Sequence, residues 1–298
     1  MPSPETLAAI ARRHRVDPGM VTPVPSQGIA NRVYFLGDHL VLRIARPETG
    51  EDLRKEAVVI PAAVRAGVRT PELVDFDDSG ALIAAPFMVL RRVIGVVPGI
   101  PEGPADERWS AAYRRLGVEL AALHAGVDAL PGVPVDESGD PRSDLARLAA
   151  AGHLSTEVTA WLSSWFDRLD PLRPSAAPAR LIHGDASPTN LLVDPETLEL
   201  KAILDWGDTA WADPAVEFAK LPLRAVPTVL AGYLGECDEA WAARILWHHL
   251  HWAVGRIATP AEPHAAHWSA QPANRLMEVM RFLLADPPSP WAALRPGA

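Results

Sequence analysis

The chain has 298 residues, a formal net charge of −9 and 48% hydrophobic residues, which predicts one large domain or two lobes around a sizeable core. Its single cysteine, Cys237, excludes an internal disulfide and is typical of a reducing cytoplasm. No apolar run approaches the roughly 20 residues needed to cross a bilayer, and the N-terminus does not resemble a signal peptide. We therefore expect a cytoplasmic protein with no membrane partner.

The negative charge is unevenly distributed. Residues 1–90 are nearly neutral, so most of the net charge lies in the remainder. An acidic surface repels phosphate backbones, which argues against nucleic acid as a partner. The same acidity is compatible with a cationic small molecule, although it is also a common route to solubility.

The first third of the chain predicts a small lobe that mixes strands and helices. Alternating apolar residues indicate strands, and apolar residues at helical spacing indicate helices. The predicted elements are a helix over 4–16, a hairpin with strands over 28–37 and 39–46, a helix over 50–67, and two strands within 71–93. The apolar face of the second helix is expected to include Leu53, Ile60 and Val64. We place this α+β lobe at residues 1–94.

The remainder, residues 95–298, predicts a larger and mainly helical lobe. Residues 95–107 are rich in glycine and proline, which is typical of a loop that crosses between lobes. Helical patterns follow over 108–126, 142–172 and 213–285.

One C-terminal helix carries an unusual set of aromatic and histidine residues. Trp247 and Trp252 lie among His248, His249 and His251. A metal site or an aromatic cage is one interpretation. We favour core packing, because no cysteine or carboxylate joins these histidines at ligand spacing.

The stretch from 181 to 206, LIHGDASPTNLLVDPETLELKAILDW, concentrates polar side chains between two apolar runs. Pro188 excludes a regular helix, so the segment before Asn190 is expected to be a loop. The apolar run after Asn190 and the one before Asp205 predict a hairpin that turns near residues 195–197. Pairing of these strands would bring Asn190 close to Asp205.

This arrangement predicts a site for phosphoryl transfer. Amide and carboxylate oxygens from Asn190 and Asp205 suit a hard cation, and Mg²⁺ is commonly held by one or two protein oxygens together with substrate phosphates. Asp185 lies apart from this pair, where it could orient a hydroxyl and accept its proton. Such a division of roles is what phosphoryl transfer requires.

The array HGDASPTN…ILDW resembles the catalytic segment of the aminoglycoside phosphotransferase family, and the following WADPAVEFAK resembles the family's next element. The resemblance implies an α+β, bilobal, protein-kinase-like fold. It also implies that Asp185 is the catalytic base and that Asn190 and Asp205 are Mg²⁺ ligands. His183 would then brace the loop through backbone hydrogen bonds rather than act as the base.

The resemblance further implies that the lobe at 1–94 binds ATP or GTP. The segment SQGIANRVY resembles the family's phosphate-covering loop, in which Ser26, Gly28 and Asn31 would bring donors to the phosphates. No G-x-x-x-x-G-K-[ST] motif occurs, which excludes a P-loop nucleotide site.

Two further features of this lobe fit the resemblance. Arg43 occupies the place of the kinase strand lysine, and Glu56 would pair with it as the kinase helix glutamate does. The alternatives are an exposed Arg43 and a Glu56 that belongs to a charged surface cluster. The main chain from Arg91 to Val93 would bond the adenine edge, with Leu90 behind it.

The resemblance implies a hydroxylated small-molecule acceptor that lies between the loop at 185–190 and the C-terminal helices. Asp208, Asp213 and Glu217 are candidates to contact a cationic acceptor. Bracing roles are the alternative for Asp213 and Glu217, because Asp-Pro commonly starts a turn or helix. His124 is expected to be a packing residue at a helix end.

The nature of the acceptor stays open at this stage. An antibiotic such as an aminoglycoside or macrolide, with a role in resistance, is the first expectation. A metabolic kinase of the choline, homoserine or ketoamine type is an alternative, as is an inactive nucleotide-binding protein. The acidic lobe favours an amine-bearing acceptor, whereas the aromatic helices favour an apolar one. We expect a monomer or a homodimer.

Overall fold

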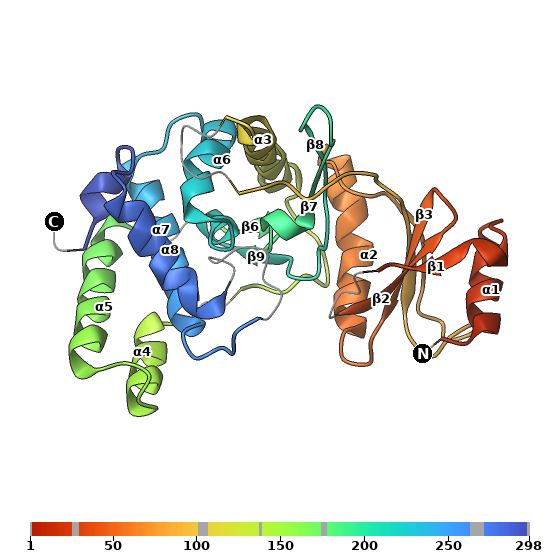
Figure 1. The fold of residues 1–298 in the computed structure, drawn as a ribbon, viewed down its shortest axis with the longest axis horizontal. Helices are drawn as coiled ribbons and strands as arrows, with labels where there is room; N and C mark the ends of the chain where they lie inside the picture. Colours follow the sequence, from red (N-terminus) through yellow and green to blue (C-terminus); the bar gives the residue numbers. More distant parts are fainter. Residues whose placement is uncertain are drawn as a thin grey trace.

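The structure is a computed structural model that describes residues 2–25, 30–100, 107–136, 139–173, 178–262 and 271–296. It has a β-rich lobe and a larger helical lobe, with helix α2 standing between the sheet and the helical part (Figure 1). No helix within these ranges is both long and apolar enough to cross a membrane.

The N-terminal lobe is built on a five-stranded antiparallel sheet in the order β1-β2-β3-β5-β4. Its elements are α1 (Pro4–Arg13), β1 (Val21–Pro23), β2 (Asn31–Leu36), β3 (Leu40–Ala45), α2 (Gly50–Arg65), β4 (Leu73–Asp77) and β5 (Phe87–Arg91). The predicted hairpin is confirmed, since Leu36 pairs with Leu40 across a turn in which Gly37 has a left-handed φ of 61°. The short strand β1 had no clear signal in the sequence.

Helix α2 turns inward a face that differs from the predicted one at Val64 and Glu56. Leu53 and Ile60 are buried as expected, but Val64 is 37% exposed and Glu56 is buried. The expected face is therefore wrong at Val64. Glu56 lies on the inner face because its carboxylate pairs with Arg43 on the adjacent sheet. An ion pair thus takes a position that hydrophobic periodicity assigns to an apolar residue.

The C-terminal lobe contains six α-helices among its described residues, together with two small sheets. The helices are α3 (Ser110–Gly126), α4 (Pro141–Ala150), α5 (Thr156–Leu169), α6 (Val226–Tyr233), α7 (Glu239–Gly255) and α8 (Arg275–Leu284). Strand β7 (Leu191–Val193) pairs with β8 (Leu200–Ile203), which confirms the predicted hairpin. Strand β6 (Arg180–Ile182) pairs with β9 (Ala210–Ala212), an unpredicted pairing.

The main hydrophobic core is shared by both lobes. Buried residues of α2 join one continuous cluster with Leu191 of β7, Trp206 and the C-terminal helices. A smaller cluster, which includes Ile10 of α1 and Leu42 of β3, lies on the other side of the sheet. The segment that leaves β5 is held against β7, because Val96 and Val193 exchange N–H···O bonds of 2.9 and 2.8 Å. These contacts fix the two lobes against each other.

Candidate active site

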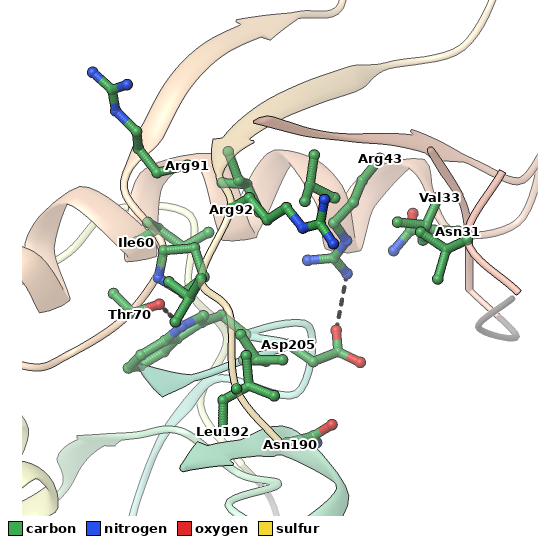
Figure 2. A pocket seen from close by; sticks show the side chains of 18 of the residues that line it. Asn31, Val33, Arg43, Ile60, Thr70, Arg91, Arg92, Asn190, Leu192 and Asp205 are labelled. Carbon is green, nitrogen blue, oxygen red and sulfur yellow. Dashed lines mark hydrogen bonds and ion pairs between the residues drawn. The ribbon is translucent and has the colours of Figure 1, made fainter. Parts of the chain in front are cut away.

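A cleft of about 540 Å³ lies between the lobes, within the size range of small-molecule sites. Figure 2 shows Asn31, Val33 and Arg43 on one wall and Asn190 and Asp205 on the other. The main-chain segment that carries Arg91 and Val93 completes the lining. Of the residues predicted for the nucleotide, Ser26 and Gly28 lie outside the described part of the chain.

The loop from residue 183 to 190 holds Asp185 and Asn190 in contact. Pro188 opens a single 3-10 turn, Pro188–Asn190, as expected for a proline at a first turn position. The Asn190 Nδ2 donates to the main-chain oxygen of Asp185 at 2.9 Å and to its Oδ2 at 3.0 Å. This leaves the Asn190 Oδ1 as the acceptor atom available to a cation.

His183 braces this loop, as predicted. It is fully buried, its Nε2 donates to the Leu204 carbonyl at 3.0 Å, and its Nδ1 accepts the Asp185 N–H at 3.2 Å. One ring nitrogen donates and the other accepts, so the imidazole is neutral. Its ring also packs edge-on against Trp206, with centroids 4.5 Å apart. Both nitrogens are occupied, and His183 therefore has no free group for proton transfer.

The β7–β8 hairpin brings Asn190 next to the segment that carries Asp205, as predicted. The Leu204 N–H donates to the Asn190 carbonyl at 2.7 Å. Asp205 then takes a left-handed φ of 64°, which is uncommon outside glycine and recurs at functional sites. Its carboxylate is about half exposed and faces the cleft (Figure 2).

The donor set at this edge fits Mg²⁺. Asn190 and Asp205 offer hard oxygen ligands and leave room for water and phosphate oxygens. Within the ranges that the structure describes, no group of three or more His, Cys, Asp or Glu side chains could hold a metal ion.

Arg43 connects the two lobes through its ion pairs. Its Nη2 donates to Glu56 Oε1 at 2.9 Å and to Asp205 Oδ1 at 3.0 Å, and its Nη1 donates to Glu56 Oε2. The predicted Arg43–Glu56 pair is thus confirmed. The Arg43 side chain is 12% exposed and that of Glu56 is 1% exposed. These values exclude an exposed Arg43 and a Glu56 that belongs to a surface cluster. Burial opposes the charge of Arg43, but Glu56 and Asp205 hold its pKa above the usual value.

The main chain after β5 offers one free donor to the cleft. The N–H groups of Arg91 and Arg92 already donate to the carbonyls of Glu72 and His39, at 2.9 and 2.8 Å. The N–H of Val93, which lines the cleft, makes no hydrogen bond to any residue that the structure describes. Within the main-chain segment expected to bond the adenine edge, the N–H groups of Arg91 and Arg92 are therefore engaged and that of Val93 is available among the described residues.

Glu217 braces the catalytic loop from beneath. It is 1% exposed, and its carboxylate accepts the His183 N–H at 2.6 Å and the Gly184 N–H at 3.2 Å. His124 donates to the same carboxylate at 3.3 Å and bonds the Tyr233 hydroxyl at 2.8 Å. Burial opposes its ionisation, but these hydrogen bonds hold the pKa of Glu217 below its usual range. The suggested contact between Glu217 and an acceptor is therefore wrong.

Asp213 is also engaged within the fold. Its Oδ1 accepts the Ala215 N–H at 2.8 Å, which caps a short 3-10 helix, and its Oδ2 accepts from Arg244 Nε at 3.1 Å. These partners match the bracing alternative for Asp213. Only Asp208 of the three candidates has an exposed carboxylate.

Asp208 lines a second cleft of about 600 Å³ on the far side of the catalytic loop. Gly184 and Gly207 border this cleft, and His251 and Trp252 of α7 form part of its wall. Trp247, in contrast, is only 5% exposed. Core packing therefore describes the inner face of α7, whereas its other face lines the second cleft. Lys55 and Arg256 also line this cleft, and no sequence motif marked them.

The sequence pattern described as "Phosphotransferase enzyme family" matches residues 21–253. The chain is 26% identical over 211 residues to acyl-CoA dehydrogenase family member 10 of Mus musculus, which covers 64% of this chain and 19% of that protein. It is 27% identical over 235 residues to an aminoglycoside 3'-phosphotransferase of Streptomyces ribosidificus. This match covers 72% of this chain and 82% of that protein. The chain thus spans about a fifth of the mouse relative.

Two solved structures have the same fold. The GDP complex of aminoglycoside 2'-phosphotransferase-IIIa superposes with a TM-score of 0.65 at 20% identity, over 93% of this chain and 96% of that chain. The macrolide 2'-phosphotransferase of Brachybacterium faecium gives a TM-score of 0.62 at 22% identity, over 99% of this chain and 98% of that chain. Together with the family pattern, this likeness confirms the expected α+β, bilobal, protein-kinase-like fold, and the chain belongs to the phosphotransferase enzyme family (APH).

Proposed function

We propose that this chain transfers the γ-phosphoryl group of ATP or GTP to a hydroxyl of a small molecule. The observation that carries the proposal is the convergence of Asn190 and Asp205 at the interlobe cleft, with Asp185 bonded to Asn190. The loop supplies one group for the hydroxyl proton and the hairpin supplies oxygens for a cation, the division that phosphoryl transfer requires. The intact set argues against an inactive nucleotide-binding protein.

In this proposal the acceptor oxygen forms a bond to the γ-phosphorus, its proton passes to the Asp185 carboxylate, and the nucleoside diphosphate leaves. The hydrogen bond from Asn190 Nδ2 holds that carboxylate in one orientation. Asn190 Oδ1 and the Asp205 carboxylate would hold Mg²⁺, which neutralises phosphate charge when bound. Arg43, which is held by its bidentate pair to Glu56, would meet the phosphates.

The other end of the cleft suits a purine base. Its walls are apolar, with Ile60 on one side and Leu192 on the other. The free N–H of Val93 supplies a donor at the edge of this space. A flat base between aliphatic side chains buries its faces and keeps one edge for hydrogen bonding. This arrangement supports a nucleotide co-substrate.

The second cleft is the proposed acceptor site, since Gly184 of the catalytic loop and Asp208 line it. The relatives' names suggest antibiotics such as aminoglycosides and macrolides, and metabolic alcohols such as choline, homoserine or ketoamines are the alternative. We place the reaction in the cytoplasm, where a free thiol such as that of Cys237 persists.

A coupled assay of ADP and GDP release tests the proposal. The purified chain is incubated with Mg²⁺, ATP or GTP, and a panel of aminoglycosides, macrolides, choline, homoserine and hydroxy acids. We expect release above the acceptor-free rate with at least one class and none with Asp185→Asn. Equal release by both proteins would reject the proposal.

A further inference from the structure

Most of the negative charge that lines the second cleft is already paired. Of the four acidic residues that line it within the described ranges, Asp208 pairs with Lys220, Asp144 with Arg147 at 2.8 Å and Asp52 with Lys55 at 3.9 Å. Lys55, Lys220 and Arg256 themselves line the cleft. An acceptor with several amines would have to compete with these ion pairs.

Arg275, at the start of α8, lies against the wall of this cleft without a counter-ion. Its guanidinium carbon lies 4.4 Å from the ring centroid of Trp252, a cleft residue. Its Nε is buried and has no hydrogen-bond partner. No ion pair joins Arg275 to any residue within the described ranges. A cation–π contact orients the group but does not replace an anion.

Two acidic residues close to Arg275 in the chain, Glu262 and Glu278, are already engaged. Glu278, one turn along α8, receives two hydrogen bonds from Arg224 at 2.6 and 2.7 Å. Glu262 pairs with Arg256 at 3.4 Å. The sequence PHAAHWSA at residues 263–270, between α7 and α8, contains no acidic residue. The local sequence therefore supplies no further carboxylate to Arg275.

A second guanidinium, that of Arg256, lies close by and is paired with Glu262. Arg256 approaches the same Trp252 ring at 5.8 Å, and its Nε is also buried without a partner. Burial and the charge of Arg256 lower the pKa of Arg275, whereas the charge of Asp185 acts in the opposite direction. Arginine stays protonated, so two like charges are held together beside the catalytic loop. Such a pair is stabilised by a bound anion.

We propose that Arg275, with Arg256, binds an anionic group of the acceptor, in the simplest case a carboxylate, while the acceptor's hydroxyl faces Asp185. The inference rests on the proposed phosphotransferase function and names its substrate class as hydroxylated acids. Guanidinium binds carboxylate through two parallel hydrogen bonds, and the Nε of Arg275 has no partner within the described residues. Trp252 would pack against the carbon chain of the acceptor.

The test compares acids with neutral analogues in two independent measurements. Glycolate, lactate, hydroxybutyrate and hydroxyhexanoate are each paired with the corresponding amide, and kanamycin and choline serve as cationic acceptors. Turnover is followed by ADP or GDP release. Binding is followed by calorimetry in the presence of Mg²⁺ and a non-hydrolysable analogue of the same nucleotide. We expect at least one acid to exceed its amide by about tenfold or more in both measurements, since a charge-assisted hydrogen bond supplies this difference.

The variants Arg275→Gln and Arg275→Lys then separate acceptor binding from other roles. We expect Arg275→Gln to raise the KM of the acid about tenfold, to leave that of the amide unchanged, and to leave kcat within a factor of about two. Arg275→Lys should restore part of the preference. Arg168→Gln, which removes an exposed arginine on α5, is the matched control and should change nothing. Thermal unfolding and nucleotide binding verify that each variant is folded.

The outcomes distinguish the two proposals. Binding that favours the acid and depends on Arg275, without any turnover, supports the inference and rejects the phosphotransferase function. Turnover of kanamycin or choline with no preference for acids rejects the inference and leaves the function intact. A loss of kcat with every acceptor in Arg275→Gln also rejects the inference, because it would place the guanidinium on the transferring phosphate.

Discussion

Arg43 and Asp205 lie 162 positions apart in the sequence, yet the Arg43 Nη2 is 3.0 Å from the Asp205 Oδ1. This ion pair joins the sheet of one lobe to the segment that follows β8 in the other lobe, across the cleft (Figure 2). It engages one oxygen of Asp205 and leaves the other free for a cation. In the proposed function, the group that would meet the phosphates and the group that would hold Mg²⁺ are therefore joined to each other across the cleft.

Replacing Arg43 should weaken nucleotide binding. We expect Arg43→Ala to raise the Kd for MgATP or MgGTP by about tenfold or more, because a charge-assisted contact to phosphate is lost. Arg43→Lys should have a smaller effect, since lysine keeps the charge but not the bidentate geometry with Glu56. Calorimetric titration measures both, with Arg54→Ala as the control for an exposed arginine of α2. Unchanged affinity in Arg43→Ala would exclude a phosphate contact.

Replacing Asp205 should remove the magnesium dependence of nucleotide binding. We expect the nucleotide Kd of the wild-type chain to fall when Mg²⁺ is added, and that of Asp205→Asn to be the same with and without Mg²⁺. The exposed carboxylate of Glu196, in the turn of the β7–β8 hairpin, provides the control variant Glu196→Gln. Titrations of Asp205→Asn that match the wild type would contradict the ligand assignment.

Replacing Asp185 should separate chemistry from binding. Asp185→Asn keeps the size of the side chain but removes the proton acceptor, so we expect kcat to fall by about 100-fold or more. The nucleotide Kd should change by less than about twofold, because Asp185 is not a proposed ligand of nucleotide or metal. Steady-state assays and calorimetry on one preparation give both values. Turnover close to wild type would remove Asp185 from the role of base.

Replacing Glu217 should destabilise the fold. Glu217→Ala leaves the buried N–H groups of His183 and Gly184 without their acceptor, and we expect the free energy of unfolding to fall by about 2–4 kcal/mol. Urea denaturation measures the loss, and Glu199→Gln provides an exposed control near β8. A residual folded fraction with altered kcat and normal nucleotide affinity would fit a displaced catalytic loop. Wild-type stability would contradict the bracing role.

His249 should make stability depend on pH. Burial, with a smaller effect of the Arg275 charge, lowers the pKa of His249 from 6.5 to about 3. Below pH 6.5 the unfolded chain binds a proton that the folded chain does not, so the free energy of unfolding falls as pH decreases towards 3. Between pH 7 and 5 we expect His249 to contribute a loss of about 2 kcal/mol, at 1.36 kcal/mol per pKa unit.

Urea denaturation of the wild type and of His249→Gln at pH 7 and 5 measures this contribution. The variant is expected to be less stable at pH 7 but to lose less stability on acidification. His248 and His251 also have lowered pKa values, so the difference between the two proteins isolates His249. Above pH 5 the lowered pKa of Glu217 does not enter, because its contribution is lost only below its usual range. An equal loss of unfolding free energy between pH 7 and 5 in the two proteins would contradict a neutral, buried His249.

Local spacing made the catalytic segment predictable. Asp185 and Asn190 are five residues apart around a proline, and the hairpin that follows has alternating residues and a clear turn, so backbone geometry alone brings Asn190 towards Asp205. The bracing of the loop by His183 belongs to the same local unit. The Arg43–Glu56 pair was predicted from the family resemblance rather than from the residues themselves. Arg43 and Glu56 are 13 positions apart in the sequence, and they lie on a strand and on a helix.

The sequence by itself determined the order of the lobes, the loop and hairpin of the catalytic segment and the residue types at the reacting edge. These features depend on contacts within a few residues or across one turn. Only the tertiary structure decided that Glu217 lies beneath the loop, that α2 turns Glu56 inward, that β6 pairs with β9, and that Arg275 meets Trp252 beside the second cleft. Each of these depends on which distant surfaces pack together and which charges are thereby paired or left unpaired, and spacing along one chain does not encode that directly.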